Sequence, residues 1–145
     1  GRACARTLQD QGVDTVVSLL LPEEIGRFGL IREAELCIAS EIDFISYPVK
    51  DHDVPPSMSQ TLMMAIRLAG LLKEERSLLL HCFAGMGRSV LLAACVMVLK
   101  GTHPEDACVR ISDARGISGL PETEEQRDWI FDFAEMLKQK RVTGF

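Results

Sequence analysis

Three short apolar runs predict β-strands, and longer stretches with helical spacing lie between them. The run 13–21 is β-branched at its start and largely apolar, which is typical of a strand buried on both faces. The run 42–49 alternates apolar and polar positions, and the run 77–82 is short and aliphatic. Strands that alternate with helices favour an α/β fold with a central, mostly parallel sheet and helices on both faces. We expect about four or five strands in this sheet.

Helices are predicted in the stretches between these strands, and polar residues that can cap a helix mark where several of them begin. Two short helices are expected over 23–30 and 31–40, the second with Leu36 and Ile38 facing the core. Capping-box sequences beginning at Ser57, Thr102 and Thr123 each predict a helix start. The stretch 88–100 is almost entirely apolar and predicts a largely buried helix. The residues expected to face the core after the first and third capping boxes are Met58, Leu62, Ile66, Ala69, Leu72, Trp129, Ile130, Phe133 and Leu137.

Composition narrows the class of protein. With 145 residues, 47% hydrophobic and 26% charged, the chain predicts one globular domain over residues 1–145. A formal net charge of −5 argues against a nucleic-acid partner, and no apolar stretch approaches the ~20 residues that span a bilayer. The five cysteines show no pairing rhythm and no C-x-x-C, so we expect reduced thiols, a cytoplasmic location and no metal.

The segment 81–89 carries the clearest chemistry, because it joins the third predicted strand to the buried helix. Backbone N–H groups converge at such a junction, and the helix dipole favours an anion there. Glycines at 85 and 87 would let the loop curl so that its amides point inward. Cys82 at the mouth of this loop would be stabilised as a nucleophilic thiolate, and the planar fork of Arg88 could hold two phosphate oxygens. We expect Cys82 at the carboxyl end of a central strand.

His81, Cys82, five further residues, Arg88 and Ser89 together resemble the signature of the cysteine-dependent protein phosphatases, in particular their small dual-specificity branch. The resemblance implies a protein-tyrosine-phosphatase-like fold in which phosphate binds the loop and Cys82 attacks it. It also implies that His81 supports the loop and that Ser89 stabilises the departing thiolate, although Ser89 could be only a helix N-cap. The residues implied to bind phosphate are Phe83, Ala84, Gly85, Met86, Gly87 and Arg88.

The segment 48–55 is similar to the family pattern Pro-x-x-Asp-x-Gly-x-Pro, which contains the general acid. Asp51 matches the acid by register and lies 31 residues before Cys82. A carboxylic acid is needed there because the leaving oxygen must be protonated as the P–O bond breaks. Asp53, which stands where the family often has Gly, is the alternative acid, and Asp51 could also be a simple turn residue.

Gln126 is the last residue that the resemblance assigns to the site. Related phosphatases often have a glutamine at the start of the last helix, where it orients the water that hydrolyses the phosphoenzyme. The alternative is structural, because Gln126 is also the third helical position of the capping box that begins at Thr123.

Several functions share this signature. The resemblance implies a monomeric protein phosphatase that needs no cofactor and hydrolyses phosphotyrosine, together with phosphoserine or phosphothreonine, in a protein or peptide. Phosphoinositide or RNA 5′-phosphate hydrolysis by the same loop is the alternative, but the loop contains no lysine to meet extra phosphates. A catalytically silent phospho-binding module would have lost Cys82, Arg88 or the acid, and this chain retains all three. A second cysteine could form a redox pair with Cys82.

Overall fold

The computed structural model describes residues 11–82 and 86–142, and it has an α/β architecture. Its strands and helices follow the predicted order, with boundaries that are shorter than predicted in the first third of the chain. In sequence the elements are β1 (Thr15–Ser18), α2 (Pro22–Arg27), α3 (Glu33–Ala39), β2 (Asp43–Ser46), α4 (Met58–Lys73), β3 (Leu78–His81), α5 (Arg88–Leu99), α6 (Pro104–Arg115) and α7 (Glu124–Val142).

The sheet of the described residues is parallel throughout and has the strand order β2-β1-β3. It contains three strands, rather than four or five, because only three segments of the described chain have strand pattern. The expectation that Cys82 follows a central strand is wrong here, since β1 is the middle strand and β3 is an edge. Ser18 at the end of β1 pairs with Ser46 on β2 and with His81 on β3, so all three strands end at one level.

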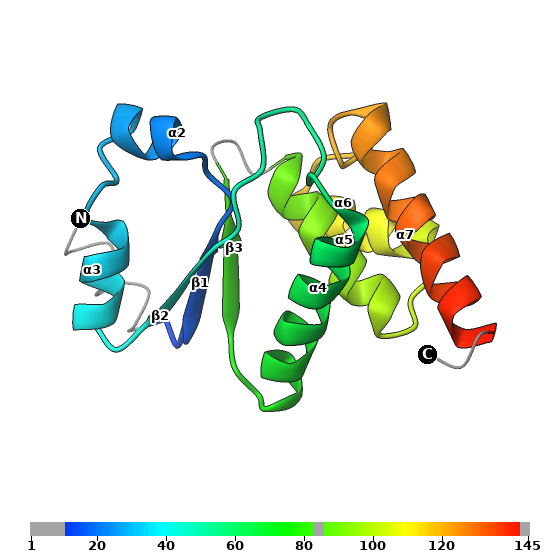
Figure 1. The fold of residues 1–145 in the computed structure, drawn as a ribbon, viewed down its shortest axis with the longest axis horizontal. Coiled ribbons are helices and arrows are strands. Elements are labelled where there is room, and N and C mark those ends of the chain that lie inside the picture. Colours follow the sequence, from blue (N-terminus) through cyan, green and yellow to red (C-terminus); the bar gives the residue numbers. More distant parts are fainter. Residues whose placement is uncertain (1–10, 83–85, 143–145) are drawn as a thin grey trace.

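Helices cover both faces of the sheet, with α3 on one side and α4 to α7 on the other (Figure 1). Alternation along β1 explains the two layers, because successive side chains of a strand point to opposite faces. Val16 packs with Cys37 of α3 and with Ile42, whereas Val17 packs into the larger cluster that includes Leu68. Both faces of β1 are therefore buried, as predicted.

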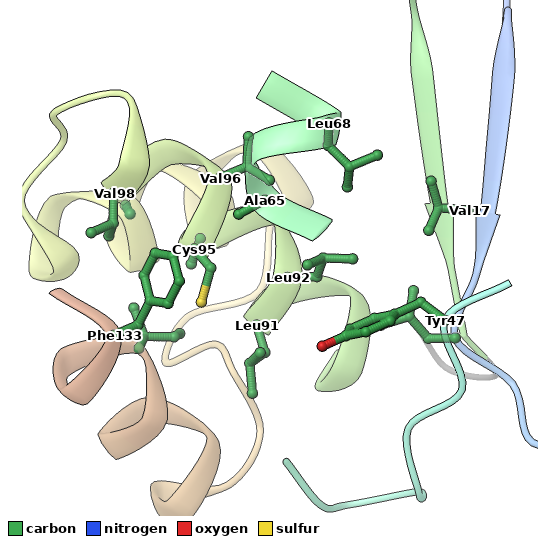
Figure 2. Packing of buried hydrophobic residues seen from close by; sticks show 14 of the residues in the cluster. Val17, Tyr47, Ala65, Leu68, Leu91, Leu92, Cys95, Val96, Val98 and Phe133 are labelled. Atoms are coloured by element: carbon green, nitrogen blue, oxygen red, sulfur yellow. The ribbon is translucent and has the colours of Figure 1, made fainter. Parts of the chain in front are cut away.

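The larger core is built around α5, and α4, α6 and α7 each pack against it (Figure 2). Side chains of α5 such as Leu91, Leu92 and Cys95 are buried, which confirms the prediction from the apolar stretch 88–100. Ile130 and Phe133 of α7 are fully buried against this helix. No helix in the described part of the chain is both long and apolar enough to cross a membrane.

Two core assignments are wrong by about one helical position. Ile38 of α3 is 68% exposed, and its neighbour Cys37 faces the sheet instead. Ile66 of α4 is 46% exposed, while Ala65 and Leu68 are buried. One residue turns a helix by about 100°, so a small error in the assumed face exchanges a core position for a surface position.

Helix starts mostly follow the capping predictions. The Ser57 side chain accepts a hydrogen bond from the backbone N–H of Gln60 and caps α4. At α6 the cap is His103 rather than Thr102, because the imidazole accepts from the Glu105 N–H and Pro104 occupies the first helical position. Ser89 is not an N-cap, since Gly87 holds that position of α5.

Candidate active site

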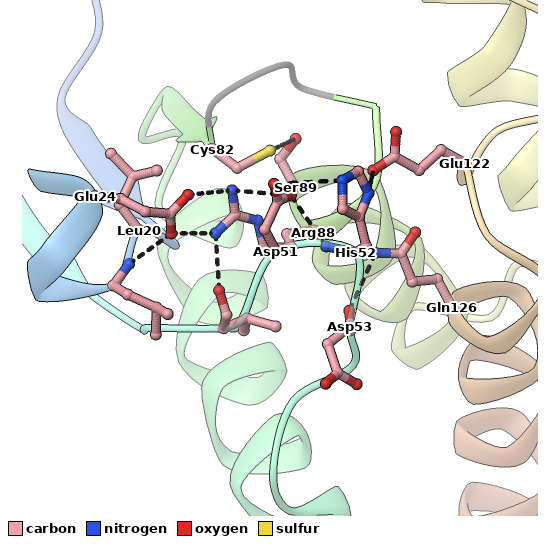
Figure 3. A network of polar contacts seen from close by, with 12 residues as sticks. Leu20, Glu24, Asp51, His52, Asp53, Cys82, Arg88, Ser89, Glu122 and Gln126 are labelled. Carbon is pink, nitrogen blue, oxygen red and sulfur yellow. Dashed lines mark hydrogen bonds and ion pairs between the residues drawn. The ribbon is translucent and has the colours of Figure 1, made fainter. Parts of the chain in front are cut away.

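The candidate site lies at the carboxyl edge of the sheet, where the segments after β1, β2 and β3 meet (Figure 3). Glu24 of α2 follows β1, Asp51 follows β2, and Cys82 directly follows β3. Because the parallel strands end in register, residues that are far apart in the sequence converge on Arg88 at the start of α5. This is the edge at which open α/β sheets place their ligands.

Cys82 is buried, with 8% of its surface exposed, and its sulfur lies 3.4 Å from Ser89 Oγ. As a thiol Cys82 donates to this oxygen. As a thiolate it could accept a hydrogen bond from the same hydroxyl. The geometry therefore suits the role implied for Ser89, which is to stabilise sulfur when it carries charge.

Arg88 is the most constrained charged group of the site. Its side chain is 1% exposed, and it is held end-on by the Glu24 carboxylate, with Nη1–Oε1 2.6 Å and Nη2–Oε2 3.0 Å. Nη1 also donates to the Val49 carbonyl at 2.8 Å. The hydrogen bonds from Arg88 lower the pKa of Glu24 against the opposing effect of burial. Burial likewise opposes the charge of Arg88. Its hydrogen bonds with Glu24, together with the nearby charges of Glu24, Asp51 and Cys82, offset this effect, so the pKa of Arg88 is raised.

Glu24 leaves the side-on edge of the guanidinium available. Among the described residues no acceptor is bound by Arg88 Nε, and Nη2 faces Asp51 Oδ1 at 3.4 Å. An oxyanion that binds Nε and Nη2 would therefore lie next to the Asp51 carboxyl. This arrangement fits the planar fork expected of Arg88.

The structure brings Asp51, rather than Asp53, next to Arg88. The Asp53 carboxylate accepts from the Val54 N–H and points away from Cys82 and Arg88 (Figure 3). Asp51 accepts from the backbone N–H of His52 at 3.0 Å, a local contact of the kind expected for a turn residue. Both interpretations of Asp51 are thus compatible, because its second oxygen remains free of backbone contacts among the described residues.

His81 supports the start of the loop through a partner on α3. Its Nε2 lies 3.0 Å from Glu33 Oε2, and both side chains are about one-fifth exposed. The hydrogen bond with Glu33 raises the pKa of His81, while burial opposes this effect. A positively charged ring is thereby favoured at the residue that directly precedes Cys82 in the chain.

Gln126 is fully buried. Its side chain links the start of α7 to the segment 48–55, which contains the predicted acid and is called the acid loop below. Nε2 donates to the Asp53 carbonyl at 3.1 Å, and Oε1 accepts from the Thr123 N–H at 3.3 Å. The Thr123 hydroxyl in turn accepts from the Gln126 N–H, so the capping box is formed. A β-carbon on Gly87 would lie 2.8 Å from the Gln126 amide, so a larger residue at that position would require the Gln126 side chain to shift.

Phe83, Ala84 and Gly85 lie outside the described residues, so their predicted contacts with phosphate stay predictions. The Met86 carbonyl accepts from the Glu122 N–H at 2.9 Å, which joins the end of the loop to the segment before α7. Four further residues that shape the site were not predicted from the sequence. These are Glu24, Glu33, His52 and Glu122.

Metal chemistry has little support in the described residues. Their one cluster of three metal-ligating side chains is Asp51, His52 and Glu122, whose ligand atoms lie within 4.8 Å of one another. All three are exposed and are already in contact with each other. A cluster of this kind does not by itself make a metal site.

Two solved structures illustrate the similarity of this fold to known proteins. A kinase associated phosphatase (KAP), with serine in place of its catalytic-site cysteine, superimposes with a TM-score of 0.86 at 24% identity, over 94% of this chain and 77% of that one. PTPMT1 in complex with PI(5)P gives a TM-score of 0.76 at 18% identity, over 94% and 85% of the two chains. These likenesses show that the chain has the fold of these proteins, and its segment 81–89 has the sequence pattern described above for cysteine-dependent phosphatases.

Sequence similarity narrows this class to a family. The family model for cyclin-dependent kinase inhibitor 3 (CDKN3) matches residues 4–108. The human protein of that name is 37% identical over 132 residues, which make up 90% of this chain and 61% of the human protein. The chain belongs to the cyclin-dependent kinase inhibitor 3 family, and it spans 61% of the length of the curated relatives of that name that it matches.

Proposed function

We propose that this chain is a phosphatase domain that removes phosphate from protein side chains through a phosphocysteine intermediate. The observation that carries the proposal is the convergence of three chemical groups at one sheet edge. Cys82 lies 3.4 Å from the Ser89 hydroxyl, and the buried Arg88 guanidinium faces Asp51 at 3.4 Å. A nucleophile, an anion clamp and a proton donor are the groups that phosphoryl transfer requires when no metal takes part.

In the proposed reaction the phosphate lies on the side-on edge of Arg88 and against the loop amides. The Cys82 thiolate attacks phosphorus, an S–P bond forms and the P–O bond to the substrate breaks. Asp51 gives its proton to the leaving oxygen. A water molecule then attacks phosphorus and gives a proton to the Asp51 carboxylate, while the S–P bond breaks and Cys82 leaves as thiolate beside Ser89. Gln126 would orient this water with the second N–H of its amide.

The proposed substrate is a phosphorylated protein, a class supported by the name of the related kinase associated phosphatase. Dual specificity is part of the proposal, because the signature over residues 81–89 resembles that of the small dual-specificity branch. We also propose a monomeric protein in the cytoplasm, where Cys82 and the other thiols would stay reduced.

Turnover of a defined panel tests the proposed function. Purified chain is incubated with phosphotyrosine, phosphothreonine and phosphoserine peptides, with a phosphoinositide and with an RNA 5′-phosphate, and released phosphate is measured. We expect turnover of the peptides, whereas Cys82→Ser should lose turnover but still bind the peptides. Exclusive hydrolysis of the lipid or the RNA would contradict the proposed substrate class. Multiple turnover by Cys82→Ser would contradict the role of the nucleophile.

A further inference from the structure

His52 stands out because it is the residue next to the proposed acid and contacts both oxygens of that carboxyl group. Its backbone N–H donates to Asp51 Oδ1 at 3.0 Å, and its ring Nε2 lies 3.5 Å from Asp51 Oδ2. Its φ of 60° lies in the left-handed region, which histidine adopts more readily than most residues. This backbone conformation turns the ring towards α7 (Figure 3).

The other side of the ring is attached to a residue 70 positions away. His52 Nδ1 lies 2.9 Å from Glu122 Oε1, the shortest polar contact that His52 makes in the described structure. Glu122 is itself fixed, because its backbone N–H donates to the Met86 carbonyl at 2.9 Å. A β-carbon on Gly87 would lie 2.9 Å from Glu122 Oε1, so the carboxylate lies directly against the start of α5.

The acid loop is thus joined to the start of α7 and the segment before it by two contacts, one buried and one exposed. The bond from Gln126 to the Asp53 carbonyl comes from a fully buried amide and holds the backbone of the loop. The contact between His52 and Glu122 lies at the surface and acts next to the Asp51 carboxyl itself. Of the two, the second involves a ring that itself lies 3.5 Å from Asp51 Oδ2.

We propose that His52 is a positioning residue that holds the Asp51 carboxyl beside Arg88 by linking it to Glu122. The inference rests on the proposed function and names one more determinant of its acid step. Asp51 Oδ1 faces Arg88 Nη2 at 3.4 Å, and Oδ2 faces His52 Nε2 at 3.5 Å, so each oxygen has a nitrogen within ion-pair distance. Without the ring, Asp51 would keep its backbone contact but lose the partner of Oδ2.

Two substitutions separate the ring from the backbone. His52→Gly removes the imidazole but accepts the positive φ without strain, and His52→Asn retains a short N–H donor in a residue that also tolerates this conformation. Glu122→Gln removes the charge of the partner and preserves its shape. Asp43→Asn is the control, because it breaks another exposed ion pair, Arg76 Nη2–Asp43 Oδ2 at 2.8 Å, which lies at the opposite end of β2.

The measurement is kcat and KM with a phosphothreonine peptide and with an aryl phosphate that has a good leaving group. Misplacing the acid should matter only when the leaving oxygen needs a proton. We expect His52→Gly to lower kcat for the peptide about tenfold, less than loss of the acid itself, with little effect on the aryl phosphate. KM and inhibition by vanadate should be unchanged, His52→Asn should recover most of kcat, and Asp43→Asn should match the wild type.

The double variant His52→Gly, Glu122→Gln decides whether the two residues act together. Since they form one link, the double variant should be no slower than the slower single variant. Losses that multiply, an equal loss with both substrates, or weaker vanadate inhibition would each overturn the inference. If His52→Gly keeps wild-type kcat on both substrates, only the inference fails. If the wild-type chain turns over neither substrate, the proposed function fails and the inference fails with it.

Discussion

Arg88 lies between two carboxylates that differ in almost every physical respect. The Glu24 side chain is 5% exposed and binds Arg88 with two short hydrogen bonds, whereas the Asp51 side chain is 48% exposed and faces the same guanidinium at 3.4 Å. Arg88 holds the pKa of Glu24 below its ordinary value, so this carboxylate keeps its charge and orients the clamp. Asp51 lies where solvent protons can reach it, as its proposed acid–base role requires. The same functional group, a carboxylate, can serve two purposes because the burial of the two side chains differs.

The largest expected effect comes from the group that both carboxylates share. Arg88→Lys would place an ammonium where the structure uses a planar fork, so neither Glu24 nor a phosphate could be bound by two parallel N–H groups. We expect kcat/KM for an aryl phosphate to fall by on the order of 10³–10⁵-fold, the range measured for an arginine that stabilises phosphoryl transfer. Near-native kcat/KM in this variant would show that Arg88 is not the clamp.

Removal of the exposed carboxylate should affect chemistry and not folding. Asp51→Ala should lower kcat for a phosphothreonine peptide by on the order of 10²–10⁴-fold, and the loss should shrink for substrates with good leaving groups. The free energy of unfolding should change little, because Asp51 is exposed. Asp53→Ala is the matched control, and a leaving-group dependence in that variant instead would move the acid by two residues.

Removal of the buried carboxylate should give the opposite result, with its main effect on stability. Glu24→Gln leaves the buried Arg88 cation without its ionic partner, which typically costs about 3 kcal/mol or more. The free energy of unfolding from urea titration at neutral pH measures this. The pKa of Glu24 is lower in the folded protein than in the unfolded chain. The extra stability of the wild type over Glu24→Gln should therefore be present when the pH is above the unfolded-state pKa, and should be lost as the pH falls through the folded-state pKa. An unchanged stability would contradict the structural role of the pair.

The smallest effect is expected for a pair of intermediate burial, His81 and Glu33, with exposed fractions of 23% and 21%. Glu33→Gln should lower the free energy of unfolding by about 1 kcal/mol. The pKa of His81 is raised above its ordinary value of 6.5 in the folded protein. The stability that the pair with Glu33 contributes should therefore be fully present at a pH below 6.5, and should be lost as the pH rises through the folded-state pKa of His81. The free energies of unfolding of the two proteins, from urea titrations, should therefore differ more at about pH 5.5 than at about pH 8.5.

The parts of the site that the sequence predicted are those in which spacing alone defines the chemistry. Cys82, Arg88 and Ser89 lie within eight residues, and a strand-to-helix turn brings such neighbours together in any fold of this type. The buried helix after them was equally clear, because an apolar stretch can be recognised without knowing its partners. Asp51 was assigned through the similarity of the segment 48–55 to the family pattern that contains the general acid.

The residues that were missed make contacts across long separations. Glu24 is 64 positions from Arg88, and nothing in its own surroundings distinguishes it from another acidic residue at a helix start. The one available signal was the sequence Leu-Pro-Glu-Glu, in which Glu24 accepts from the Leu21 N–H and closes the first turn of α2. His52 and Glu122 pair over 70 positions, which requires knowledge of where α7 begins. The sequence pattern predicts each helix and strand separately, but the pairs between distant residues depend on how these elements pack in three dimensions.

The common level at which β1, β2 and β3 end has a consequence for how such a protein can diverge. The connection after β1 contains Glu24, which orients the Arg88 cation. In the proposed reaction, the connection after β2 would deliver the proton and the connection after β3 would supply the nucleophile. An insertion in the connection after β2 would alter proton delivery and access for bulky substrates without disturbing the paired strands beneath. New substrate ranges can therefore arise by exchange of one connection at a time, on a sheet whose buried residues stay unchanged.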